Sequence, residues 1–226
     1  MNNIDNIKIY KRWVGLYDLL FGSKYISKQR EAEISMLNLK EEDNILFVGI
    51  GTGEDLRFIP KGINVTGVDI TNEMLDRQHL IIVGVSLLRV DITNEMLDIA
   101  RKKVDELGLE KANIINMDGQ NLEFEQNHFD YVVLNLILSV IPDGNKALKE
   151  AYRVLKPGGK IAIFDKFIED EKSPNIMRLL LNRITKSLGT DINRKFSKII
   201  ENVNLKVQEE KKSILGGMYR IIILEK

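Results

Sequence analysis

Residues 44–53 read NILFVGIGTG, an apolar run that passes directly into three glycines at alternate positions. The apolar run predicts a buried parallel strand, because a strand that is covered on both faces is continuously hydrophobic. The glycines allow a tight turn and let a ligand approach backbone N–H groups at the next helix. A plain turn that caps a helix would use the same residues. The motif alone therefore predicts either a ligand-binding loop or a simple turn.

Strand-like and helical patterns alternate along the chain on both sides of this loop. Before the loop, helical spacing covers 10–39; after it, strands are expected at 63–68, 113–117, 131–136 and 160–164, and helices at 94–108 and 146–155. This alternation predicts a doubly wound parallel sheet, since parallel strands need helical crossovers. In the tail we expect helices at 176–188 and 193–203, then an antiparallel hairpin of strands 206–211 and 219–224.

Length and composition exclude several classes of protein. The chain has 226 residues, with 33 Lys and Arg, 33 Asp and Glu, two His and no Cys. This length predicts a single domain that folds without disulfides or metal. The missing Cys and scarce His exclude thiolate or histidine-rich metal sites, and the zero net charge argues against a general nucleic-acid partner. No signal peptide or run of membrane-spanning length is evident, so we expect a cytoplasmic protein; its oligomeric state is not predicted.

One segment of the chain occurs twice. Residues 68–76 read VDITNEMLD, and the same nine letters recur at 90–98, 22 residues later. Two copies do not make a solenoid, which needs at least three repeats. We interpret the segment 68–98 as a duplicated strand–helix junction inside one domain.

The duplication leaves three arrangements for the second strand. Either 63–68 forms it and the extra residues follow, or 85–90 forms it after a long loop, or both are strands with a helix between them. The apolar run at 80–83 favours an arrangement that buries it, since burial of each such side chain contributes about 1.5–3 kcal/mol. In the first and third arrangements Asp69 stands beside the first strand. We therefore expect Asp69, rather than Asp91, to serve the binding loop.

Polar motifs follow the expected strands in a fixed order. Glu54 stands where a dinucleotide-binding loop has its third glycine, and its carboxylate would repel a pyrophosphate. Asp69 comes 20 residues after the first glycine, where a carboxylate can accept hydrogen bonds from ribose hydroxyls. Asp118 and Gly119 follow the third strand, where Asp118 can accept from an adenine amino group. A Pro-Gly-Gly turn at 157–159 precedes the fifth strand.

Taken in order, these segments resemble the class I S-adenosylmethionine-dependent methyltransferases, especially those of ubiquinone and menaquinone biosynthesis (the methyltransferase type 11 domain). The resemblance covers roughly residues 10–170. It implies a Rossmann-like, seven-stranded sheet in the order 3-2-1-4-5-7-6, with strand 7 antiparallel. It also implies a helical lid at 1–40, a cofactor-binding core at 41–170, and a helical cap with the terminal hairpin at 171–226.

The same resemblance implies that S-adenosyl-L-methionine is the cofactor. The implied cofactor-binding residues are Gly49, Gly51, Thr52 and Gly53 for the methionine and ribose part, Asp69 for the ribose, Asp118 and Gly119 for the adenine, and Asn135. One residue departs from the family pattern. Phe47 stands two places before the first glycine, where the family commonly has an acidic residue, so backbone carbonyls and Glu54 must bind the cofactor's ammonium group or affinity falls.

Catalytic residues are not predicted. Methyl transfer from a sulfonium relies on positioning and exclusion of water more than on acid–base groups. Ligands of open α/β sheets lie beyond the carboxyl ends of strands, which selects Asn135 and Asp165 as candidates. Asn135 would serve equally well to cap its strand, and Asp165 to pair with Lys166. Leu-Ile-Leu follows Asn135 in place of the Pro-Pro-aromatic run of amine and amide methyltransferases, which disfavours that chemistry.

The sequence thus predicts an enzyme, an S-adenosylmethionine-dependent methyltransferase that acts on a small apolar or amphipathic acceptor. The alternative is an S-adenosylmethionine-binding protein with little or no catalytic activity, which Phe47 favours. A nicotinamide-dependent oxidoreductase is disfavoured by Glu54 and by the antiparallel tail.

Overall fold

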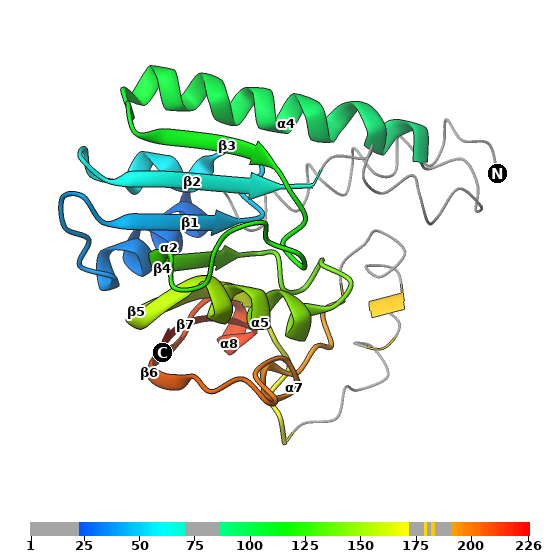
Figure 1. Ribbon diagram of the computed structural model, residues 1–226. Helices are drawn as coiled ribbons and strands as arrows, with labels where there is room; N and C mark the ends of the chain where they lie inside the picture. Colours follow the sequence, from blue (N-terminus) through cyan, green and yellow to red (C-terminus); the bar gives the residue numbers. More distant parts are fainter. Residues whose placement is uncertain (1–22, 71–85, 172–178, 180–181, 184–190) are drawn as a thin grey trace.

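A single seven-stranded sheet, in the order β3-β2-β1-β4-β5-β7-β6, forms the centre of the protein (Figure 1). The computed structural model describes residues 23–70, 86–171, 179, 182–183 and 191–226. The strands are β1 Asn44–Val48, β2 Asn64–Asp69, β3 Ala112–Asn116, β4 Phe129–Asn135, β5 Leu155–Lys166, β6 Lys206–Lys212 and β7 Tyr219–Glu225. β7 runs antiparallel to both β5 and β6, and the other neighbours are parallel. The predicted fold class, strand order and antiparallel seventh strand are confirmed.

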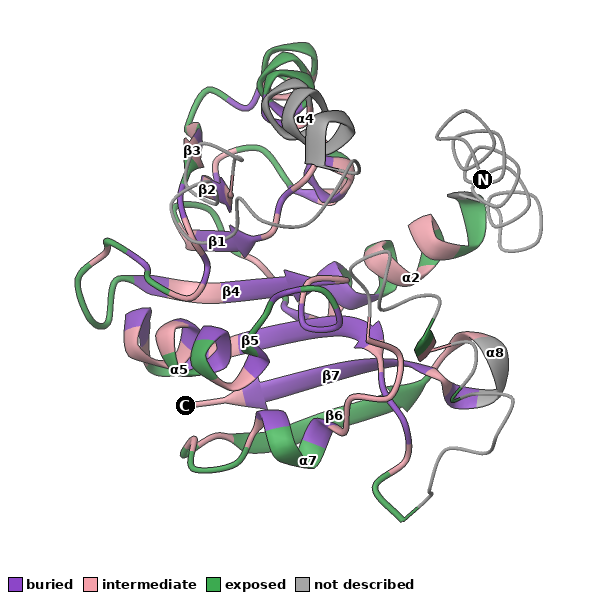
Figure 2. Ribbon diagram, turned by 90° about the vertical axis from the view of Figure 1, so that its right-hand side faces the viewer, coloured by how far each residue is buried: buried purple, intermediate pink, exposed green. Residues whose placement is uncertain are grey.

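Helices cover both faces of this sheet. They are α2 Ser23–Met36, the 3-10 helix η1 Glu54–Phe58, α4 Ser86–Leu107, α5 Gly144–Val154, and two short helices, α7 Phe196–Ile199 and α8 Ile214–Gly217. In the described ranges, none of the helices combines the length and apolarity needed to cross a bilayer. Figures 1 and 2 place α5 and α7 on one side of the sheet, with α2 and α4 on the other.

Neighbouring residues of the central strands pack into hydrophobic cores on opposite faces of the sheet, because successive side chains of a strand point to opposite faces. Val132 and Ile161 pack in one core with Leu148 of α5. On the other face, Val133 and Ala162 belong to a core that includes residues of α2, η1 and α4. Figure 2 shows β4, β5 and β7 as largely buried strands, whereas β6 is an exposed edge.

The strand order reverses between β1 and β4, and this reversal positions the site. β1 pairs with β2 on one side and with β4 on the other, so the chain leaves β1 in one direction and later returns to its opposite edge. Loops diverge at such a point, and they leave a crevice at the carboxyl ends of the two strands. The glycine loop at 49–53 emerges there.

The residues that begin the two copies of the repeat have different structures. Val68 of the first copy pairs with Val48 and Ile115 inside the sheet, whereas the second copy lies within α4. Pairing with β1 and β3 therefore decides the conformation of Val68, and pairing with β3 that of Asp69. Because α4 begins at Ser86, the two arrangements that place a strand at 85–90 are wrong. The apolar run 80–83 lies outside the described residues.

Other differences from the expected elements lie near the chain termini. The helix expected at 193–203 has four residues, because Lys195 bridges to Ile168 before it and Asn202 adopts a left-handed φ of 61° after it. The helix expected at 176–188 and residues 10–22 lie largely outside the described residues. The predicted division into lid, core and cap stays a prediction.

Candidate functional site

The glycine loop after β1 is tied to the end of β2. The N–H groups of Gly49 and Ile50 both donate to the carbonyl of Val68, at 2.8 and 3.1 Å. Gly49 has a φ of +75°, a conformation that L side chains rarely adopt. A Cβ atom there would lie 2.8 Å from the side chain of Ile137, which follows β4. Glycine is therefore required at position 49, where the loop passes close to the β4 end.

Asp69, the last residue of β2, faces this loop. Its Oδ2 accepts a hydrogen bond from the N–H of Gly51 at 2.7 Å, and its Oδ1 accepts from the N–H of Ile70 at 2.8 Å. Burial raises the pKa of Asp69, and the two N–H donors partly oppose that rise. The expected neighbourhood of Asp69 and the glycine loop is thus present, with the carboxylate oriented by the backbone.

A cavity of about 300 Å³ lies beside the loop at the carboxyl ends of β1, β2 and β4. Five of the eight predicted cofactor-binding residues line it: Gly49, Gly51, Thr52, Asp69 and Asn135. The remaining wall comes from Arg30 of α2, Met96 of α4, Ile50 and Glu54 at the glycine loop, and the segment after β4. Residues far apart in the sequence therefore meet in one hollow.

This cavity is assembled from both copies of the repeat. Asp69 belongs to the first copy, whereas Met96 belongs to the second copy. Met96 reaches the glycine loop, since a Cβ atom on Gly51 would lie 3.2 Å from its methyl carbon. The equivalent of Met96 in the first copy, Met74, lies outside the described residues. One copy thus provides the strand end and the other provides the helix face.

The other three predicted residues lie near the cavity but not in its lining. Gly53 is the N-cap of η1, with a φ of 72°. Asp118 accepts hydrogen bonds from the backbone and side-chain nitrogens of Gln120, so its carboxylate stabilises the turn after β3. Gly119 packs against the end of β1, where a Cβ atom would lie 2.5 Å from Val48. The loop after β3 therefore abuts the strand that carries the glycine loop.

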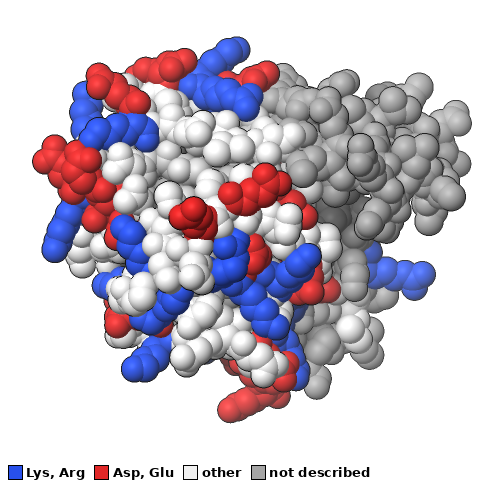
Figure 3. Space-filling view, viewed as in Figure 1, with Lys and Arg blue, Asp and Glu red and all other residues white. Residues whose placement is uncertain are grey.

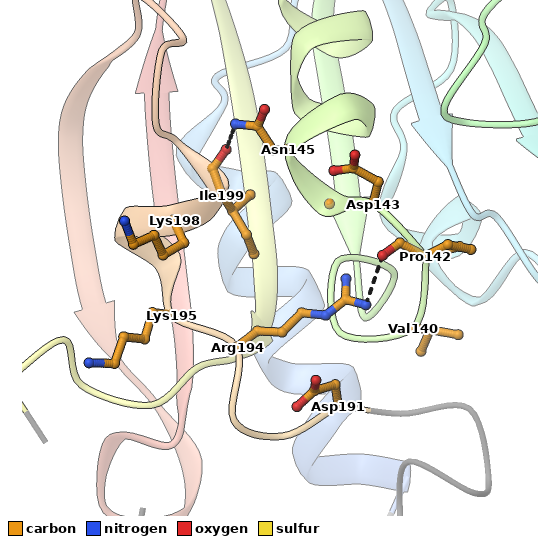
Figure 4. A pocket seen from close by; sticks show the side chains of 10 residues that line it. Val140, Pro142, Asp143, Asn145, Asp191, Arg194, Lys195, Lys198 and Ile199 are labelled. Carbon is orange, nitrogen blue, oxygen red and sulfur yellow. Dashed lines mark hydrogen bonds between the residues drawn. The ribbon is translucent and has the colours of Figure 1, made fainter. Parts of the chain in front are cut away.

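A second, larger cavity of about 670 Å³ lies between the N-terminal end of α5 and the segment around α7 (Figure 4). Val140 lines both cavities. Arg194 crosses the second cavity, and its guanidinium donates to the carbonyls of Leu138 at 2.6 Å and Pro142 at 3.3 Å. The rest of the lining mixes apolar and charged side chains: Asp143, Gly144, Asn145, Asp191, Lys195, Lys198 and Ile199.

The sequence matches one known family over most of its length. A model of the ubiE/COQ5 methyltransferase family matches residues 8–172. The chain belongs to this family. The protein is therefore a class I S-adenosylmethionine-dependent methyltransferase, as the resemblance implied, and S-adenosyl-L-methionine is its cofactor.

Relatives of this methyltransferase differ in the acceptors that their names give. The phosphatidylethanolamine N-methyltransferase of Cereibacter sphaeroides is 29% identical over 214 residues, which are 94% of this chain and 93% of that enzyme. The demethylmenaquinone methyltransferase of Listeria welshimeri is 27% identical over 169 residues, which are 73% of this chain and 56% of that enzyme. The fold also matches geranyl diphosphate C-methyltransferase from Streptomyces coelicolor A3(2), with a TM-score of 0.67 and 15% identity over 88% of this chain and 80% of that one.

The residues of the smaller cavity fit S-adenosylmethionine. Gly49 and Gly51 let Ile137 and Met96 approach the loop closely, and Asp69 lines the same cavity. When bound, the cofactor supplies a methyl group on a positively charged sulfur. The methyltransferase itself would bind the nucleoside with Asp69, hold the loop amides in place and exclude water.

A buried polar network lies directly behind this cavity. Asp55 of η1 is 2% exposed, and its carboxylate accepts from Arg30 at 2.5 Å and from the side-chain amide of Asn135 at 3.0 Å. The side-chain oxygen of Asn135, Oδ1, accepts a hydrogen bond from the N–H of Phe164 at 3.1 Å. Glu33 of α2 is fully buried beside Asp55 and Asn135. Two members of this network, Arg30 and Asn135, also line the cavity.

Sequence reasoning found only Asn135 of this network. Arg30, Glu33 and Asp55 were not among the residues predicted for the site. One signal in the sequence could have indicated Glu33: this acidic residue lies on the same helix face as the apolar residues Ile34 and Leu37. Asp165, the other candidate at a strand end, is fully buried, accepts from the N–H groups of Ser139 and Lys166, and does not line the cavity.

Proposed function

We propose that this methyltransferase transfers a methyl group to a small amphipathic acceptor that lies in the larger cavity. The observation that carries the proposal is the contact between the two cavities, which share Val140 as a wall. The larger cavity offers apolar surface from Pro142 and Ile199 beside the charged groups of Arg194 and Asp191, a mixture that suits an amphipathic molecule. The Cereibacter relative, similar over nearly its whole length, is named for such a lipid acceptor.

We also propose that the eight predicted residues hold the cofactor. Gly49, Gly51, Thr52 and Gly53 would contact its methionine and ribose part, Asp69 its ribose, Asp118 and Gly119 its adenine, and Asn135 the wall nearest the acceptor. The lining of the smaller cavity by five of these residues supports the proposal. No acid or base is assigned, because a sulfonium is already activated and positioning supplies most of the acceleration.

A transfer assay with radiolabelled S-adenosylmethionine tests the acceptor class. Phosphatidylethanolamine in detergent micelles, a demethylmenaquinone analogue and free ethanolamine would be compared as acceptors. We expect label in at least one of the two amphipathic acceptors, at a rate more than about tenfold above that of ethanolamine, since burial of an apolar part contributes binding energy. Transfer to free ethanolamine alone, or to none of the three, would contradict this acceptor class.

Two exposed valines provide a matched pair of variants for this assay. Val140 is 44% exposed between the two cavities, and Val207 is 50% exposed on the distant strand β6. We expect Val140→Glu to raise the KM for the acceptor and Val207→Glu to leave it unchanged. Equal effects of the two substitutions would show that the larger cavity does not bind the acceptor.

A further inference from the structure

An unpaired carboxyl group lies behind the wall of the cofactor cavity. Glu33 of α2 is 0% exposed, and neither of its carboxyl oxygens has a hydrogen-bond partner within the described part of the chain. A buried carboxylate is strongly unfavourable without a partner, so such a group either keeps its proton or receives a cation. Within the described residues, Glu33 is thus a buried carboxyl group whose oxygens accept no hydrogen bond.

The groups that act on Glu33 come from four elements. Burial is the largest effect and, together with the charge of Asp55 on η1, raises the pKa of Glu33 well above its usual range. Asp165 of β5 adds to this rise, whereas Asn135 of β4 and Arg30 of α2 oppose it. Arg30 does not neutralise Glu33, because its guanidinium already pairs with Asp55 at 2.5 Å. Burial and the two neighbouring carboxyl groups thus shift Glu33 toward the neutral acid, against Arg30 and Asn135.

Among the described residues that line the cavity, Asp69 is the one carboxylate that no Lys or Arg pairs, so a cationic ligand meets a single uncompensated negative charge there. S-adenosylmethionine carries an ammonium, a sulfonium and one carboxylate, which sum to one positive charge. Glu54 lines the cavity, but its carboxylate already pairs with Arg57 and Lys103. Asp69 already accepts two backbone hydrogen bonds. The smaller cavity thus gains a positive charge on binding, and Glu33 is a nearby buried carboxyl group whose oxygens accept no hydrogen bond in the described part of the chain.

We propose that Glu33 is a positioning residue for the cofactor. The carboxyl group of Glu33 releases its proton to solvent when S-adenosylmethionine binds. The resulting carboxylate acts through Asn135 and Arg30, the two side chains of the network that line the cavity. It balances the positive charge of the cofactor and, with Asp55, holds these two side chains in place. The inference rests on the proposed cofactor site and adds to it a charge that comes from outside the glycine loop.

Isothermal titration calorimetry in two buffers of different ionisation enthalpy counts the protons released on binding. At neutral pH we expect the wild type to release up to about one proton with S-adenosylmethionine, because a group that ionises fully on binding releases one. Release should be smaller with 5′-methylthioadenosine, which lacks both the ammonium and the sulfonium. In Glu33→Gln we expect the release with S-adenosylmethionine to fall and affinity to weaken by about tenfold, the effect of one pKa unit of coupling.

Further arms separate this role from a merely structural one. Glu33→Asp keeps a titratable carboxyl group and should restore part of the proton release, whereas a structural role would change the melting temperature without changing the proton count. Equal release by the wild type and Glu33→Gln would overturn the inference. Should Glu33→Gln not fold, equal release with both ligands by the wild type would overturn it as well. Failure of the wild type to bind S-adenosylmethionine would instead contradict the cofactor site itself.

Discussion

At the scale of single residues, Asp69 links the sheet to the glycine loop. One carboxylate oxygen accepts from Gly51 in the loop, and the other accepts from Ile70. These two bonds fix the direction in which the carboxylate faces the cavity. A change at Asp69 therefore alters both the ligand contact and the order of the loop.

We predict that Asp69→Asn weakens binding of S-adenosylhomocysteine by about 10- to 100-fold, since hydrogen bonds to a charged group contribute roughly 1.5–3 kcal/mol. Asp91→Asn, in the second copy of the repeat, is the matched control and should leave affinity unchanged. Because the pKa of Asp69 is raised, wild-type affinity should begin to fall with decreasing pH above the usual aspartate range of about 3.9. Isothermal titration measures both effects, and a larger effect of Asp91→Asn would reassign the ribose contact.

Some residues of the site could be predicted from the sequence and others could not. Gly49 and Asp69 were predictable, because each directly follows a stretch of sequence with a clear strand pattern, at 44–48 and 63–68. Glu33 and Asp55 were not, because their meeting depends on how α2 and η1 pack against the end of β4. A buried carboxyl group on an otherwise polar helix has no clear pattern in one sequence, since its burial is decided by tertiary contacts.

At the scale of elements, the repeat shows that identical letters do not fix a conformation. Val68 and Asp69 end a strand, whereas Val90 and Asp91 lie inside α4. The strand at 63–68 and the helix at 94–108 were both predicted within a residue or two at most ends. The start of α4 at Ser86 was not predicted. Residues 90–98 repeat the letters of 68–76, so only the part of α4 beyond this repeat had a helical pattern of its own. The short α7 was mispredicted for a similar reason, since the bridge to Ile168 is a contact between distant segments.

At the level of these elements, we predict the effect of deleting residues 70–91. The deletion removes one 22-residue period and restores a single VDITNEMLD. Asp69 and Met96 already line one cavity, and the remaining link of four residues can span up to about 17 Å. We therefore expect the shortened protein to fold cooperatively and to bind S-adenosylhomocysteine within about tenfold of the wild type, a loss of no more than about 1.4 kcal/mol.

Circular dichroism and isothermal titration would measure this outcome. The control is the same deletion with Asp69→Asn, which should lose affinity as it does in the full-length protein, because Asp69 provides the ribose contact in both. A shortened protein that folds but does not bind would show that the removed segment contributes to the site.

At the scale of the whole molecule, the C-terminal strand is part of the central core. β7 lies between β5 and β6, and Ile222 is fully buried in the same core as Leu148 of α5. The hairpin pattern at 206–224 predicted both strands. It did not predict that β7 would enter the sheet interior while β6 took the edge, although the resemblance did imply this order.

We predict that Ile222→Ala lowers the free energy of unfolding by about 2–5 kcal/mol, the usual cost of such a cavity in a core. Val207→Ala, on the exposed neighbour β6, should change it by less than about 0.5 kcal/mol. Urea denaturation followed by circular dichroism compares the two variants. Similar values for both would mean that β7 contributes little to the core.

The exposed edge formed by β6 has a consequence for the protein at high concentration. All seven residues of β6 are exposed, and five of them are Lys or Glu of mixed sign. Figure 3 shows the same mixture of charges over the visible face. A strand from another molecule that paired with this edge would have to strip water from those charges, which disfavours edge-to-edge aggregation. The charged side chains along the outer edge of β6 thus oppose pairing of this edge with a second molecule.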